Sequence, residues 1–147
     1  MEITMAARTF FGVVIMLFVL ALTGHAGVNE EIQKYFNDTA SKVEATDDPV
    51  QKREILDNSF ESMMKALDRV QSLPVISDED RTGIAHLKSI IQEYQDELAG
   101  LNGFERVPDG QLNAFSQYVV QNVEQARTIT ISLTTLLLII IIILLLV

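Results

Sequence analysis

The last nineteen residues, 129–147, constrain this chain more than any other stretch. They read Ile-Thr-Ile-Ser-Leu-Thr-Thr and then twelve consecutive Leu, Ile and Val residues. As an α-helix this run would be about 28 Å long, which matches the hydrocarbon thickness of a bilayer and exceeds the usual length of a buried helix. The sequence therefore predicts a single C-terminal transmembrane helix that anchors the chain, and it places the working parts before Ile129.

The N-terminal residues have the order of a secretory signal. Arg8 precedes thirteen apolar residues, 10–22, and Thr-Gly-His-Ala follows at 23–26. This order predicts a signal peptide over 1–26 with cleavage after Ala26. An uncleaved first membrane span is the alternative, although thirteen residues are short for one. Either way, the domain over 27–128 is expected on the extracytoplasmic side of a membrane.

The charge of this domain excludes several functions. Of the 20 acidic residues only Glu2, and of the 11 basic residues only Arg8, lie outside 27–128, so the domain has a net charge of about −9. This balance disfavours nucleic acid as a partner. The chain has no cysteine, which excludes disulfides and cysteine-based zinc sites. About one hundred residues suffice for one small core.

Four stretches of the domain have apolar residues at helical spacing and no strand pattern. The stretch over 49–72 carries a heptad seam of the kind found in coiled coils. We therefore predict an all-α, up-and-down four-helix bundle. The four stretches are 29–45, 49–72, 78–99 and one that starts near 111, and their apolar positions are Ile32, Phe36, Ala40, Val43, Leu56, Phe60, Met63, Leu67, Val70, Ile84, Leu87, Ile91, Tyr94, Leu98, Leu112, Phe115, Val119, Val123 and Ala126.

The ends of the third stretch are marked by their residues. Ser77 is a typical N-cap, and Asp80 three residues later gives a start that resembles a capping box. Gly100 is a typical residue after the end of a helix. By contrast, no proline or glycine lies between Gln111 and Val147. We therefore expect the fourth bundle helix to continue into the membrane as one rod of about 37 residues.

Alternation of helix direction then divides the connections between two ends of the bundle. The connection between the second and third helices is expected near the membrane, where Leu73, Val75 and Ile76 would rest in the interface or fold over the core. The connections over 46–50 and 101–110 are expected at the distal tip. The residues predicted there as a docking site for a partner are Asp47, Asp48, Glu105, Arg106 and Asp109.

Hydroxyl residues mark one face of the predicted anchor. Thr128, Ser132 and Thr135 recur at spacings of four and three. Small hydroxyl side chains let membrane helices approach closely and form hydrogen bonds across the contact. They can also bond to their own preceding carbonyls, which is the alternative reading. A lipid-anchor attachment signal is a second alternative for this end, but it lacks the usual polar spacer.

The sequence carries no pattern that indicates catalysis. The predicted mature domain has one histidine, His86, and there is no phosphate-binding loop, nucleophile elbow or metal-ligand spacing. We therefore expect no enzyme activity, no cofactor and no metal.

Binding or assembly is the expected function, with the bilayer and a protein as partners. The first hypothesis is an accessory, scaffold or interaction subunit of a membrane complex. The second is a surface or structural protein that assembles with itself. A sensor-type ligand-binding bundle is a weaker third, because a span that ends the chain leaves no segment to relay a signal inward.

Overall fold

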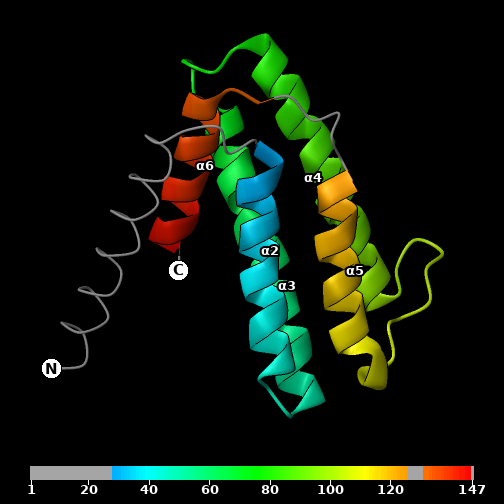
Figure 1. The fold of residues 1–147 in the computed structure, drawn as a ribbon. Helices are drawn as coiled ribbons and strands as arrows, with labels where there is room; N and C mark the ends of the chain where they lie inside the picture. Colours follow the sequence, from blue (N-terminus) through cyan, green and yellow to red (C-terminus); the bar gives the residue numbers. More distant parts are fainter. Residues whose placement is uncertain (1–27, 126–130, 147) are drawn as a thin grey trace, which may run out of the picture.

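The computed structural model describes residues 28–125 and 131–146. This part of the chain folds as five α-helices packed as a bundle, with one short 3-10 turn and no strand (Figure 1). The elements are α2 (Val28–Glu44), α3 (Pro49–Gln71), α4 (Asp78–Ala99), η1 (Asp109–Gln111), α5 (Leu112–Gln125) and α6 (Leu133–Leu146). The predicted all-α bundle is therefore confirmed. The predicted signal segment, 1–26, lies outside the described residues.

The apolar stripes of the sequence form the core. Every apolar position predicted on α2 to α5 that the structure describes is buried, including the whole heptad seam of α3. The centre of the core is aromatic. The Phe60 ring lies 5.9 Å from Phe36, 6.1 Å from Tyr94 and 6.3 Å from Phe115, so α3 contacts α2, α4 and α5 at one level. Met63 is buried in the same seam and acts there as a core residue.

The helix ends follow the local sequence. Asp48 caps α3 by accepting a hydrogen bond from the Val50 amide at 2.9 Å, and Pro49 occupies the first turn. Ser77 caps α4 by accepting from the Asp80 amide at 3.1 Å. Gly100 ends α4 with φ of +75°, a left-handed conformation that suits glycine. These starts and stops place α2, α3, α4 and α5 in the predicted alternating directions (Figure 1).

The prediction of one continuous rod from α5 into the C-terminal run is wrong. Ile131 and Ser132 are not helical, and α6 turns back to run alongside α3 (Figure 1). Burial explains the difference. Leu136, Ile139 and Ile143 are buried in the bundle, and each such side chain contributes about 1.5 to 3 kcal/mol when it leaves water. Helical continuity would leave these side chains in water unless a membrane received them.

The predicted transmembrane helix is also not present as such. No helix in the described residues combines the length and the apolar character needed to cross a bilayer. The apolar run instead supplies the fifth helix of the bundle, which has 14 residues.

Candidate functional site

The start of α6 is held by a carboxylate from another helix. Asp80, in the first turn of α4, is buried. Its Oδ1 accepts a hydrogen bond from the Ser132 amide at 2.9 Å, and its Oδ2 accepts from the hydroxyls of Ser132 at 2.6 Å and Thr135 at 2.7 Å. We call these three residues the Asp80 cluster. An acid at a helix N-terminus also interacts favourably with the helix dipole. Asp80 therefore acts as a cap for α6 from across the bundle.

Local capping positions this carboxylate. The Ser77 hydroxyl accepts from the Asp80 amide, so the backbone of Asp80 is fixed in the first turn of α4. On the other side, the Ser132 hydroxyl accepts from the Thr135 amide at 3.3 Å, as an N-cap does. Each side of the contact is thus organised by its own helix start. Within the described residues, no buried side-chain nitrogen or oxygen lacks a hydrogen-bond partner.

The electrostatics of the cluster favour the ionised carboxylate. Burial alone raises the pKa of Asp80, but the hydrogen bonds from Ser132 and Thr135 outweigh it, so the pKa falls below its ordinary value of 3.8. The carboxylate is therefore charged at neutral pH. Hydrogen bonds that involve an ionised group are stronger than neutral ones, about 1.5 to 3 kcal/mol each. This contact is a strong polar link between α4 and α6.

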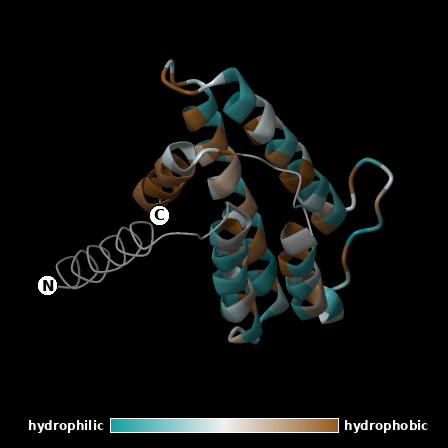
Figure 2. Ribbon diagram, turned by 45° about the horizontal axis from the view of Figure 1, so that its top comes forward, coloured by the Kyte–Doolittle hydropathy of each residue, from teal (hydrophilic) through white to brown (hydrophobic). Residues whose placement is uncertain are grey.

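The surface of α6 differs from that of the other helices. Apart from two threonines near its start, it consists entirely of Leu and Ile, and Figure 2 shows it hydrophobic along its length while α2 to α5 alternate. The bundle covers one face of α6. On the open side, Leu145 is 75% exposed and Ile141 is 37% exposed. A helix that is apolar on all sides is normally surrounded by protein core or lipid, and here only part of it is covered.

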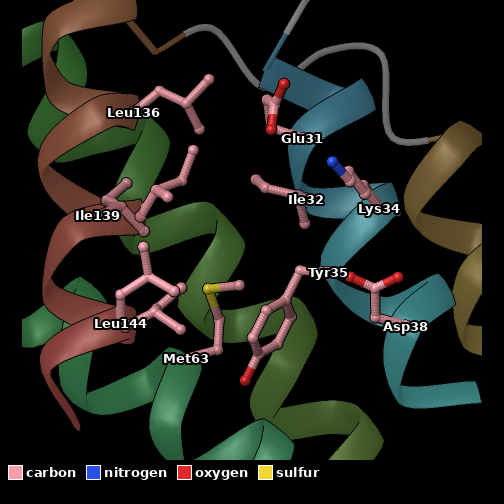
Figure 3. A pocket seen from close by; sticks show the side chains of 11 residues that line it. Glu31, Ile32, Lys34, Tyr35, Asp38, Met63, Leu136, Ile139 and Leu144 are labelled. Atoms are coloured by element: carbon pink, nitrogen blue, oxygen red, sulfur yellow. The ribbon is translucent and has the colours of Figure 1, made fainter. Parts of the chain in front are cut away.

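A cavity separates α6 from α2. It has a volume of about 320 Å³, and in Figure 3 the side chains of Leu136, Ile139 and Leu144 face Ile32 and Met63 across it. Polar groups of α2 stand along the other side of the cavity, namely Glu31, Lys34, Tyr35 and Asp38. The contact of α6 with α3 is therefore close, whereas its contact with α2 is incomplete.

One of these residues also ties α2 to α3. The Tyr35 hydroxyl donates to the Ser59 carbonyl at 2.8 Å. Burial raises the pKa of Tyr35, and the hydrogen bond with Ser59 offsets part of that effect. This hydrogen bond joins α2 to α3 beside the cavity.

The predicted hydroxyl face of the anchor is partly brought together. Ser132 and Thr135 meet at Asp80, where their hydroxyl oxygens lie 3.0 Å apart and each hydroxyl donates to the carboxylate. Thr128 lies outside the described residues. The hydroxyls of Ser132 and Thr135 are thus bound within the chain, and their contact with another membrane helix stays a prediction.

The predicted membrane-interface loop divides between core and solvent. Ile76 is buried and Leu73 packs against the core, whereas Val75 is 79% exposed. Leu73 and Ile76 therefore pack on the core, and contact of this loop with a membrane interface stays a prediction. The loop lies at the same end of the bundle as the start of α6 (Figure 1).

The predicted distal docking residues are spread over two connections at the other end. Asp48 caps α3. Asp109 forms an ion pair with Arg53, with 2.9 Å between Asp109 Oδ1 and Arg53 Nη2. The same guanidinium donates to the carbonyls of Leu98 and Val107, which fastens the long connection to α3. The remaining predicted residues, Asp47, Glu105 and Arg106, are exposed. Their role in docking stays a prediction.

The sequence reading missed the role of Asp80, which it treated only as part of a helix start. Its partners lie more than 50 positions away, on a helix that was expected to leave the bundle. The unusual aspartate in the place of the preferred Glu or Gln was the one available signal.

Other chemistry is sparse in the described part of the chain. His86 is exposed, and no three His, Asp or Glu side chains there could hold a metal ion. Comparison of the chain with protein-family models, curated proteins and solved structures found no match.

Proposed function

We propose that this protein is a membrane-attached helical bundle on the extracytoplasmic side that works by binding, as an accessory, scaffold or interaction subunit of a membrane complex. The observation that carries the proposal is the uncovered apolar side of α6, where Ile141 and Leu145 meet solvent. Contact of this apolar side with water is unfavourable in free energy, whereas contact with lipid is not. The run over 129–147 has the length of a bilayer span once it is helical throughout.

The charge distribution supports separate roles for the apolar run and for the domain before it. The apolar run carries no charged residue, while the preceding domain carries a net charge of about −9. In this proposal the apolar run supplies the attachment and the acidic bundle stays in water. The acidic surface then selects partners with basic or neutral surfaces, because like charges repel.

Vesicle flotation of the full chain tests the attachment. Replacing Ile141 and Leu145 by arginine should strongly reduce flotation with phosphatidylcholine vesicles, since a charge at Ile141, near the middle of the run, costs about 2.5 to 3.5 kcal/mol and Leu145→Arg adds a second charge near its end. The matched control replaces the exposed apolar residues Val50 and Leu101 by arginine, and it should float like the unchanged chain. Equal flotation of both variants would refute attachment through α6.

Mass measurement after extraction in mild detergent tests the role. An accessory or scaffold subunit should co-purify with unlike chains at a fixed ratio. A single species in large multiples would instead support the self-assembling alternative. A monomer alone would contradict both.

A further inference from the structure

The amide of Ser132 has two competing acceptors. In a helix that continued from α5 it would donate to the carbonyl four residues earlier. In the structure it donates instead to Asp80 at 2.9 Å, and the Ser132 and Thr135 hydroxyls bind the same carboxylate. Asp80 therefore stabilises the start of a separate α6 at the point where the sequence otherwise favours an unbroken helix.

The rest of the α6 contact is unevenly packed. Leu136, Ile139 and Ile143 are buried, but they also line the cavity of about 320 Å³ between α6 and α2. Side chains that line a void lose dispersion contacts, which weakens the docked state. The open side of α6 also leaves Ile141 and Leu145 exposed. The polar link at its start is thus a large part of what holds it.

From these observations we propose that Asp80 is a latch residue that holds α6 against the bundle, and that its release lets α6 leave the bundle for a lipid bilayer. The lipid step rests on the proposed membrane attachment, whereas the latch step does not. The bilayer fits as the receiving phase because it covers α6 on all sides. After release, the hydroxyls of Ser132 and Thr135 can bond to carbonyls of their own helix, so they enter lipid with partners.

A distance measurement in the full chain tests the latch. The chain has no cysteine, so cysteines introduced at the exposed positions Asn58 on α3 and Leu145 on α6 can carry the only two spin labels. We expect a short distance between the labels in the docked state, because α6 runs alongside α3. Release moves the α6 label away by roughly 20 Å or more, about the length of a 14-residue helix.

The decisive variant is Asp80→Ala, measured in buffer and with phosphatidylcholine vesicles. We expect a long-distance population already in buffer, and half-conversion at a lipid concentration at least tenfold lower than for the unchanged chain. The matched control is Glu79→Ala, which removes an exposed acid from the same helix turn. It should behave like the unchanged chain. If Asp80→Ala keeps the short distance and the original lipid dependence, the latch is refuted.

Two further readouts separate the possible failures. If Asp80→Ala fails to fold by circular dichroism, the double variant Ser132→Ala with Thr135→Val removes the same contact from the α6 side and should give the same shift. A variant that lengthens the distance in buffer without binding vesicles would uphold the latch and refute the membrane attachment. A short distance in both latch variants would refute the latch whatever the vesicles show.

Discussion

Asp80 is placed where a carboxylate is unfavourable unless it is fully hydrogen-bonded. It is 7% exposed, and it accepts three hydrogen bonds from Ser132 and Thr135. Removing one partner from a buried charge costs more than the bond itself contributes, because the charge stays desolvated. The cluster is therefore sensitive to single substitutions and to protonation.

The lowered pKa of Asp80 predicts an acid-sensitive contact. Its folded-state pKa lies below the ordinary value of 3.8, so its contribution to stability is complete above that value and is lost as the pH falls through the folded-state pKa. The difference in melting temperature between the unchanged chain and Asp80→Asn should thus shrink between about pH 6 and pH 2. A constant difference over this range would contradict the assignment. Asp78→Asn, which changes an exposed acid, serves as the control.

Gly100 predicts a second residue-scale effect. A Cβ added there would lie 2.7 Å from the backbone nitrogen of Arg106, and φ is +75°. Gly100→Ala should lower the free energy of unfolding by more than the roughly 1 to 2 kcal/mol of the left-handed conformation alone. Gly103 has φ of +89°, but a Cβ added there would meet no atom within 4 Å. Gly110 has neither a left-handed φ nor an atom within 4 Å of an added Cβ. Denaturant unfolding should rank the three losses in that order, and equal losses for Gly100 and Gly103 would refute the clash.

At the scale of helices, local sequence patterns predicted α2 to α5, whereas the position of α6 was decided by burial against the bundle. The apolar spacing of α3 and the caps at Asp48 and Ser77 each depend on residues a few positions apart, so they can be predicted directly from the sequence. The position of α6 depends on what surrounds it, because its sequence is apolar on all sides and does not indicate which side packs against the bundle. A run that is apolar on all sides is compatible with both lipid and a bundle surface. For the same reason, the Asp80 cluster could not be predicted without knowing that α6 folds back.

The contact between α4 and α5 gives an element-scale prediction. Burial, together with Tyr118 and the carboxylates of Glu93 and Glu97, raises the pKa of Tyr94 to about 12, although a hydrogen bond with Asn122 opposes this. Because the folded-state pKa is raised above 10.0, the stabilising effect is complete below pH 10 and is lost as the pH rises through about 12. Absorbance titration of phenolate should lose this late-ionising group in Tyr94→Phe. An unchanged titration curve in that variant would refute the burial of Tyr94 against α5.

At the scale of the whole molecule, four amphipathic helices form a stable acidic body, and a fifth, wholly apolar helix lies against it. The body has an aromatic core centred on Phe60, and the starts of α3 and α4 are capped by Asp48 and Ser77. The apolar helix contributes buried surface but leaves a cavity and an open apolar side. Such partial packing is what we expect of a helix that can also be buried elsewhere, and we propose that this other site is the bilayer.

The central claim is tested most directly by the labelling rates of single cysteines on the two sides of α6. Ile143 faces the bundle and Leu145 faces outward, so in buffer a maleimide should modify Leu145→Cys much faster than Ile143→Cys. With phosphatidylcholine vesicles both positions should become slow, because lipid surrounds the helix. Equal rates in buffer would contradict the docked helix, and a rate at Leu145→Cys that vesicles do not change would contradict its transfer to the bilayer.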